Sequence, residues 1–344
     1  YGMNQKRVQA TVASTTSSIG VEIACDKEDT KHLLEQANIA VPKGDIVRSE
    51  RGLKDAVDYI GYPLVIKPIN GNHGRGITIN INNWDDALVG FNAAKEISRS
   101  VIIEKYITGD DYRLLVINYK LVAAAKRTPA HVIGDGKSTI QELIDKINED
   151  PRRGYGHENV LTMITVNEMT ETILSANNLT LESILENDEI LNLKDTANLS
   201  TGGTATDVTD IVHPQNIFMA ERIARVVGLD ICGIDVMTSD ISVPLTETGG
   251  AILEVNAGPG FRMHLAPTEG LPRNVAAHVV DMIYPPGSDT RIPIVAVTGT
   301  NGKTTTTRLI AHMVKMMGHK VGFTTSDGIY IQNHMLDKGD CTGP

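Results

Sequence analysis

A strand, a glycine-rich loop and a helix follow one another near the end of the 344-residue chain, and this order constrains the local fold. Residues 294–310 read IVAVTGTNGKTTTTRLI, an apolar run followed by a Gly-Lys-Thr loop and a helical segment. Backbone amides and the helix dipole at such a helix start attract phosphate. Lys303 can reach terminal phosphates, and Thr304 can ligate Mg²⁺. The segment therefore predicts a phosphate-binding turn in an α/β unit.

The charge and cysteine content narrow the range of partners. The formal net charge is −10 and the pI about 5.5, which disfavours a nucleic-acid partner because phosphate binding needs a basic face. No apolar run approaches the roughly 20 residues of a membrane helix. Cys25, Cys232 and Cys341 show no metal-ligand spacing, which favours reduced thiols. We therefore expect a cytoplasmic protein with no nucleic-acid or membrane partner.

Changes in composition along the chain predict its division. Pro285–Ser288 has the composition of a linker. The chain starts at Tyr1 without a methionine and stops at Pro344 directly after a loop, so we expect a fragment at both ends. The expected parts are the end of a preceding segment at 1–20, a large domain at 21–285 with an irregular polar insertion at about 150–210, a linker at 286–293 and a truncated second domain at 294–344.

A hairpin with a glycine-rich tip is predicted early in the large domain. Residues 63–68 form a short apolar strand closed by proline, 71–76 read GNHGRG, and 77–81 alternate apolar and polar. Glycines let backbone amides approach phosphates closely, and Lys67 and Lys27 can neutralise phosphate charge. Because the loop lies in a hairpin and opens no helix, we reject a dinucleotide-binding fingerprint.

Oxygen-bearing side chains stand on two later strands. Asp235 lies in the predicted strand 233–237, while Glu254 and Asn256 close the strand 252–255. Carboxylate and amide oxygens are the ligands that Mg²⁺ prefers, with waters and phosphate oxygens completing the octahedron. Taken alone, each signal has an ordinary alternative. A strand-end lysine is often a solvated surface charge, and a Glu-x-Asn pair is more often a surface pair than a metal site.

The order of these signals resembles the ATP-grasp superfamily from end to end. In the spacing of its parts the chain is similar to D-alanine–D-alanine ligase and glutathione synthetase. The resemblance implies an α+β fold, within the α/β class, in which two subdomains sandwich ATP. The motifs that carry it are DKEDTK at 26–31, VIKP at 65–68, GNHGRG at 71–76, EKYI at 104–107, GDD at 109–111, GIDV at 233–236 and LEVNAGPG at 253–260.

This resemblance implies a role for each matched position. The implied cofactors are ATP and Mg²⁺, and in such enzymes ATP phosphorylates a carboxylate before an amine attacks the acylphosphate. Metals and lysines offset the charge on the transferred phosphoryl group. The implied nucleotide contacts are Lys27 and Lys67 on the phosphates, Gly71, His73, Gly74 and Gly76 in the closing loop, Glu104 on the adenine amino group, the backbone of Tyr106 and Ile107, and Asp111 on the ribose hydroxyls. The implied magnesium ligands are Asp235, Glu254 and Asn256.

The later loop, GTNGKTT at 299–305, departs from the common P-loop pattern, because Val297 stands where the first glycine of GxxxxGK would be. This shorter form resembles Mur ligases and folylpolyglutamate synthetase, which join amino acids to carboxylates through acylphosphates. With a strand at Lys320–Thr325, it predicts the first βαβ unit of a P-loop Mur ligase-like domain, cut short by the end of the chain. The implied nucleotide-binding residues are Gly299, Asn301, Gly302, Lys303, Thr304 and Thr305.

The two domains in series resemble the cyanophycin synthetase family over essentially the whole chain. The specific stretches are KPINGNHGRGITINI, NLSTGGTATDVTDIVHP, EVNAGPGFRMHLAPTEG and VAVTGTNGKTTTTRLI. That family builds a polyaspartate backbone with arginine on each β-carboxyl. The resemblance implies that the ATP-grasp site adds L-aspartate to the C-terminal carboxylate of a cyanophycin primer and that the Mur-type site adds L-arginine. It also implies a homo-oligomer, dimeric or tetrameric.

Match to this family implies substrate and catalytic residues as well. Arg113 is physically apt, since a guanidinium can hold a carboxylate with two bonds and Asp111 precedes it on the same strand face. An Arg on a strand edge is nevertheless more often a surface ion pair, a loop histidine such as His73 is often merely solvated, and the composition around Ser200 suits any flexible loop. The neighbouring Arg152 and Arg153 are a solvated pair or a docking point for an acidic substrate. The implied substrate residues are Glu22, Arg113, Ser200 and Arg262, and the implied catalytic residues are Arg113, His73 and Lys67.

Three other functions stay open. Another ATP-grasp amino-acid ligase, similar to glutathione synthetase, would lack the GTNGKTT segment. A regulatory ATP-binding module without ligase activity could lose the lysines and metal ligands that this chain keeps. A variant of the same family that polymerises Asp-Arg dipeptides at one active site is compatible with all of the sequence.

Overall fold

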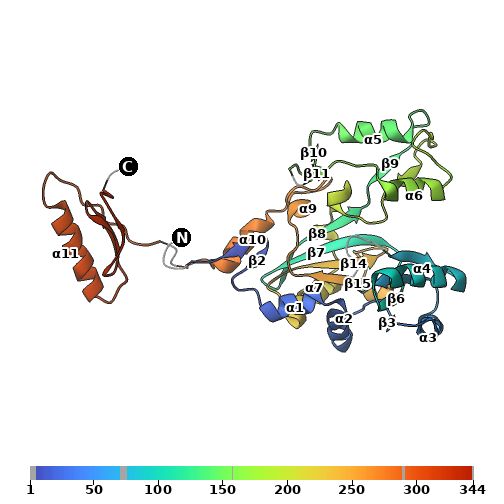
Figure 1. Ribbon diagram of the computed structural model, residues 1–344, viewed down its shortest axis with the longest axis horizontal. Helices are drawn as coiled ribbons and strands as arrows, with labels where there is room; N and C mark the ends of the chain where they lie inside the picture. Colours follow the sequence, from blue (N-terminus) through green and yellow to red (C-terminus); the bar gives the residue numbers. More distant parts are fainter. Residues whose placement is uncertain (1–4, 70–75, 157, 289–290, 343–344) are drawn as a thin grey trace. The chain divides into compact units, whose positions relative to one another are not determined.

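The computed structural model describes residues 5–69, 76–156, 158–288 and 291–342 (Figure 1). The chain separates into two compact units. One covers Lys6–Ser288, and the other comprises residues 289–344 together with 1–5. The larger unit contains the ATP-grasp motifs, and the smaller one contains the GTNGKTT loop.

A four-stranded antiparallel sheet, in the order β3-β6-β4-β5, forms the first part of the larger unit. Leu53 and Phe91, from the two helices that cover it, share one core with the strand residues Ile66 and Ile103. The predicted hairpin of β4 and β5 is confirmed, and its tip at 70–75 lies outside the described residues. The elements are β3 (Gly44–Val47), α3 (Glu50–Ile60), β4 (Leu64–Pro68), β5 (Thr78–Ile81), α4 (Trp84–Ile97) and β6 (Val101–Lys105).

A five-stranded antiparallel sheet in the order β13-β8-β7-β14-β15 forms the second part. Because side chains alternate along a strand, each strand presents one apolar face and one mixed face. Leu114, Ile234 and Val255 point to the apolar face, which α1, α2 and α7 cover (Figure 1). The elements are α1 (Ser18–Cys25), α2 (Lys27–Gln36), β7 (Asp110–Ile117), β8 (Lys120–Thr128), β13 (Thr204–Asp207), α7 (Pro214–Val227), β14 (Ile231–Thr238) and β15 (Ala251–Asn256).

The segment between β8 and β13 corrects the expectation of an irregular insertion at about 150–210. It contains α6 and short strands, and with α5 it encloses a separate apolar core that includes Ile144, Leu174 and Leu193. The elements are too short for their hydrophobic spacing to predict them. Thr139 and Glu142 form a capping box at the start of α5. The elements are β9 (His131–Ile133), α5 (Ile140–Asn148), β10 (Arg153–Gly154), β11 (Leu161–Thr162), α6 (Glu168–Ala176), β12 (Ile190–Asn192) and the 3₁₀ helix η1 (Leu199–Thr201).

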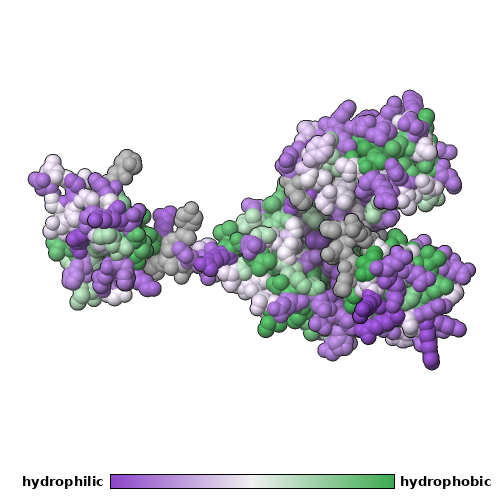
Figure 2. Space-filling view, viewed as in Figure 1, coloured by the Kyte–Doolittle hydropathy of each residue, from purple (hydrophilic) through white to green (hydrophobic). Residues whose placement is uncertain are grey.

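Short elements complete the larger unit. In the space-filling view, a hollow separates the part that carries α5 and α6 from the part that carries α4 (Figure 2). Across the described residues, no helix has the length and apolar character needed to cross a lipid bilayer. The remaining elements are β1 (Val8–Gln9), β2 (Val12–Ala13), η2 (Thr209–Ile211), α8 (Leu245–Thr248), α9 (Arg262–Leu265) and α10 (Val275–Ile283).

The smaller unit consists of one helix and a three-stranded antiparallel sheet, in the order β16-β17-β18. The predicted βαβ unit is wrong in its first strand, because residues 294–298 form no strand and Ile294 is 84% exposed. A strand needs a neighbour for its backbone hydrogen bonds, and none of the described strands of this unit pairs with that segment. The elements are α11 (Lys303–Met316), β16 (Gly322–Thr325), β17 (Gly328–Ile331) and β18 (His334–Lys338).

The core of the four-stranded sheet gives a stability prediction. Ile103 is fully buried on the central strand β6, so Ile103→Ala should lower the free energy of unfolding by about 2–5 kcal/mol through lost burial and a cavity. Urea unfolding followed by the fluorescence of Trp84, the single tryptophan, reports on this core. Val89→Ala, at a position 69% exposed on α4, is the matched control and should change stability by less than about 0.5 kcal/mol. Equal effects of the two substitutions would contradict the described core.

Candidate functional site

A cavity of about 540 Å³ lies between helix α2, the four-stranded sheet and strand β15. Asp26 starts α2, since its side chain accepts hydrogen bonds from the amides of Glu28 and Asp29. Residues four apart on a helix lie on one face, so Lys27 and Lys31 both line the cavity. Other charged residues of its wall are Glu28, Asp29, Glu35, Asp45, Arg48, Lys67, Glu104 and Glu254.

Glu104 is the buried centre of this cavity wall. Lys31 Nζ lies 3.2 Å from its Oε1, and Lys67 Nζ donates to its Oε2. Burial opposes the ionisation of Glu104, but Lys67 and Lys31 together outweigh it and hold the pKa of this carboxyl below its usual value. Glu104, the expected adenine contact, thus has two ammonium partners in this arrangement. The expected phosphate contact Lys67 is one of them.

The backbone contacts expected from the segment after β6 are not part of the cavity wall. The Tyr106 amide donates instead to the carbonyl of Pro63, at 3.0 Å. Ile107 follows it and, like Tyr106, is absent from the described lining residues. The segment is thus held against the start of β4.

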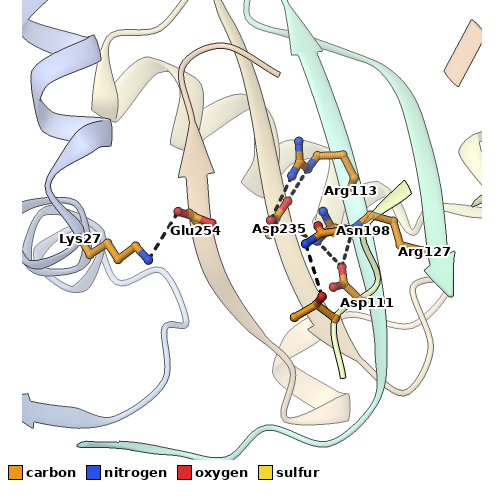
Figure 3. Close-up of polar contacts among 8 residues, drawn as sticks. Lys27, Asp111, Arg113, Arg127, Asn198, Asp235 and Glu254 are labelled. Carbon is orange, nitrogen blue, oxygen red and sulfur yellow. Dashed lines mark hydrogen bonds and ion pairs between the residues drawn. The ribbon is translucent and has the colours of Figure 1, made fainter. Parts of the chain in front are cut away.

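The three expected magnesium ligands lie on one face of the five-stranded sheet. In the antiparallel register Asp235 is opposite Glu254, and Gly233 is opposite Asn256. Glu254 faces the cavity, where Lys27 Nζ lies 3.9 Å from its Oε1 (Figure 3). The register therefore places Asp235 and Glu254 side by side, with Asn256 two residues farther along β15.

Two arginines bind the carboxylate of Asp235. Arg113 donates to it from Nε and, at 3.1 Å, from Nη2, and Arg127 Nη2 lies 3.1 Å from Oδ2. Arg127 also binds Asp111, through Nε at 2.9 Å and Nη2 at 2.6 Å. Figure 3 shows these four side chains in a row across strands β14, β7 and β8. Burial, aided by the nearby Asp235, raises the pKa of Asp111 against the pull of Arg127.

This network bears on whether magnesium fits the site. Glu254 and Asn256 offer hard oxygens on one sheet face. Both fit a magnesium ion. Asp235 fits one only if an arginine releases it, and the described residues contain no cluster of three or more His, Cys, Asp or Glu arranged for a metal. Arg113 in turn is not free to hold a substrate carboxylate in this arrangement, and Asp111 meets Arg127 where a ribose was expected.

The other expected residues of the larger unit are spread over several elements. Glu22 is exposed on α1 and does not line the cavity. Ser200 is exposed on η1, and Arg262 begins α9, where it donates to the carbonyl of Asn159 and to Thr162 Oγ1. Gly76 has a φ of 70°, a left-handed backbone that suits glycine. Of the remaining loop predictions, Gly71, His73 and Gly74 lie outside the described residues.

The loop of the smaller unit bends as a helix start requires. Gly302 has a φ of 77° and immediately precedes α11. The Lys303 ammonium folds back onto the Gly299 carbonyl at 2.8 Å, and Thr304 Oγ1 lies 3.4 Å from Ser326 Oγ. Five of the six predicted nucleotide-binding residues are exposed, Thr304 being half-buried: Gly299, Asn301, Gly302, Lys303 and Thr305.

Sequence reasoning gave no role to Lys31 or Arg127. Lys31 could have been found, because it lies one helical turn after Lys27. Arg127 could not have been found by counting from the β7–β8 turn. A bulge between Leu115 and Val116 shifts the register, so that Arg127 faces Asp111 and Lys126 does not.

Two sequence families match parts of the chain. A RimK-like ATP-grasp domain matches residues 24–148, and a Mur ligase middle domain matches residues 297–341. The bifunctional glutathione synthetase structure from Pasteurella multocida matches with a TM-score of 0.64 and 31% identity, covering 83% of this chain and 39% of that one. The chain thus has the ATP-grasp fold, followed by a short segment of a Mur ligase middle domain.

Cyanophycin synthetases match this chain over its whole length. The chain is 57% identical to cyanophycin synthetases of Synechocystis sp. and Crocosphaera subtropica, over all of its length and 40% of theirs. A glutathione biosynthesis bifunctional protein of Clostridium perfringens is 36% identical over 80% of this chain and 36% of its own length. The chain belongs to the cyanophycin synthetase family and spans about two-fifths of the length of those relatives.

His264 gives a pH-dependent prediction. It is 2% exposed on α9, and neither ring nitrogen has a partner among the described residues. Burial, aided by Arg113, lowers its pKa to about 3 from an ordinary 6.5. The unfolded chain therefore takes up this proton as the pH falls below 6.5 while the folded chain does not, so stability is lost between pH 6.5 and pH 3.

We expect His264→Gln to remove this part of the pH dependence, which amounts to at most about 1.4 kcal/mol per pH unit. Urea unfolding of the wild type and the variant across this pH window measures the difference. His278→Gln, at an exposed position on α10, is the control and should keep the wild-type slope. Parallel curves for wild type and His264→Gln would show that the buried imidazole is not the source.

Proposed function

We propose that the chain is the part of a cyanophycin synthetase that adds L-aspartate to the C-terminal carboxylate of a polyaspartate backbone at the expense of ATP. The observation that carries the proposal is the cavity that Lys27, Lys31 and Lys67 line, where Lys27 lies near Glu254 and the other two lysines bind Glu104. Such a concentration of ammonium groups beside a carboxylate suits a triphosphate with its metal. The full-length identity to cyanophycin synthetases supports the choice of substrate.

The reaction follows the acylphosphate route. The backbone carboxylate attacks the γ-phosphorus of ATP, which gives an acylphosphate and ADP. The amine of L-aspartate then attacks the acyl carbon, phosphate leaves, and the amine proton passes to solvent. Lys27 and Lys67 would offset the phosphate charge, and Lys31 is added to them as a third cation. Mg²⁺, held by Glu254 and Asn256, would supply positive charge that offsets the negative charge of the transferred phosphoryl group.

The chain's own residues would position the reactants. Glu254 and Asn256 are the proposed magnesium ligands, with Asp235 joining them after exchange of an arginine partner. Arg113, once released, would hold the carboxylate that is activated. The other proposed contacts are Gly71, His73, Gly74 and Gly76 over the phosphates, Glu104, Tyr106, Ile107 and Asp111 around the nucleoside, and Glu22, Ser200 and Arg262 around the substrates.

The smaller unit is proposed to belong to a second ligase site. Its loop, Gly299 to Thr305, would bind a nucleotide for the addition of L-arginine to the β-carboxylate of the new aspartate. We propose a cytoplasmic homo-oligomer with no nucleic-acid or membrane partner. An ATP-grasp ligase similar to glutathione synthetase is the alternative, favoured by the likeness to the Pasteurella multocida structure. A variant that polymerises Asp-Arg dipeptides is another.

Glu254 tests the first site. With Mg-ATP and an acidic primer, ADP release should depend on L-aspartate, and Glu254→Gln should lower its rate by about 100-fold or more. Glu247→Gln, at an exposed position on α8, should leave the rate unchanged. ADP release that is indifferent to aspartate would refute the proposed substrate. Release driven instead by glycine with a γ-glutamyl dipeptide would favour the glutathione-synthetase-like alternative, and release driven by Asp-Arg dipeptides would favour the polymerising variant.

Lys303 tests the second site, in the protein at the length of its relatives. Lys303→Ala should abolish the addition of L-arginine to a polyaspartate primer while L-aspartate addition continues, and Glu254→Gln should do the reverse. Amino-acid incorporation measured by mass spectrometry separates the two products. If either substitution stops both additions, the two sites are not independent.

A further inference from the structure

Two arginines from distant parts of the larger unit converge on one buried threonine. Arg153, on β10, donates from Nη1 to the carbonyls of Thr162 (2.6 Å) and Gly202 (3.1 Å). Arg262, at the start of α9, donates from Nη2 to Thr162 Oγ1 at 3.3 Å and from Nη1 to the Asn159 carbonyl at 3.2 Å. Thr162 is only 6% exposed, so the two guanidinium groups are fixed around one point.

Neither of these guanidinium groups has a carboxylate partner among the described residues. Every oxygen that they bind is a neutral carbonyl or hydroxyl, and both side chains are half-buried. Nε and Nη2 of Arg153 and Nε of Arg262 make no hydrogen bond to a described residue, so both guanidinium groups retain free donors. Burial lowers the pKa of both groups, in Arg153 against the weaker attraction of Asp150.

The neighbouring Arg152 shows the contrast. Its guanidinium is exposed and binds the carboxylate of Asp150 through Nε and, at 2.8 Å, through Nη2. From the sequence alone, Arg152 and Arg153 had the same interpretation, a solvated pair or a docking point for an acidic substrate. The structure separates them: Arg152 binds a carboxylate at the surface, and Arg153 turns inward and hydrogen-bonds only to neutral carbonyls.

The arginine pair lies beside the face that carries the candidate site. Met263, which follows Arg262, packs with Leu199 of η1 and with Ala125 of β8. Ala125 is the register partner of Arg113, so α9 and η1 sit next to the Arg113–Asp235 contact. Exposed Ser200 lies on the same 3₁₀ helix.

We propose that Arg153 and Arg262 form a carboxylate-binding subsite that holds an aspartate residue of the acidic substrate. The subsite deepens the proposed function and rests on it for the identity of the ligand. Two guanidinium groups with free donors can bind a carboxylate in a bidentate manner, and the carboxylate supplies the missing negative charge. Neutral oxygens hold the arginines in place before the ligand arrives, which lowers the entropy cost of binding.

Isothermal titration calorimetry of the 344-residue chain tests this subsite. L-aspartate and tetra-L-aspartate are titrated separately, so that the free amino acid and the polymer end are distinguished as the source of the carboxylate. Arg153→Gln and Arg262→Gln should each raise the Kd of the ligand that binds by about 10-fold or more. Arg152→Gln is the matched control and should keep the wild-type Kd. Arg153→Lys retains the charge but loses the fork and should fall between wild type and Arg153→Gln.

Each outcome decides one proposal. Unchanged binding in both glutamine variants, an equal loss in Arg152→Gln, or no binding of either ligand by the wild type would overturn the subsite. Thermal unfolding of every variant shows whether a lost affinity reflects lost folding, and Arg153→Lys keeps the test valid if a glutamine variant does not fold. If the wild type binds aspartate through these arginines but releases no ADP with it, the proposed ligation fails while the subsite stands.

Discussion

The alternation of charge across three strands of the five-stranded sheet fixes the geometry of the candidate site. Asp111, Arg127, Asp235 and Arg113 bind one another in turn on a buried face. A charge left without its partner in such a place costs about 3–5 kcal/mol, so the strands that carry these groups are held in one register. Strand β15 pairs with β14 in a register of its own, which places Glu254 opposite Asp235. Packing of the opposite face against α7 covers the sheet. It distinguishes one strand register from another less strongly than the ion pairs do.

Much of the scaffold could be predicted because its signals are local. The hairpin of β4 and β5 was predicted from two short apolar segments that lie close together in the sequence, and the structure has it. The side of β15 that carries Glu254 and Asn256 also followed from a period of two. The full-length likeness to cyanophycin synthetases, inferred from the motifs, was confirmed by the comparisons.

The partners of the charged groups could not be predicted in the same way. Arg113 meets Asp235 across 122 residues of sequence, and Lys31 meets Glu104 across 73. Such pairings depend on sheet order and on a bulge that no residue pattern announces. The prediction of a first strand in the smaller unit was wrong for a related reason. An apolar segment forms a strand only when a neighbouring strand pairs with its backbone, and the segment's own residues do not show whether such a neighbour exists.

The two ammonium groups that grip Glu104 have a consequence for discrimination among anions. The carboxylate acts as an internal counter-ion to both ammonium groups. An incoming ligand gains only the difference between its own attraction for Lys31 and Lys67 and that of the resident carboxylate. Chloride or a single phosphate carries little charge and would compete poorly with the carboxylate for the two lysines. A polyphosphate would be able to displace the carboxylate from both lysines together. The Glu104 carboxylate therefore sets the minimum negative charge that an anion must carry to bind Lys31 and Lys67 in its place.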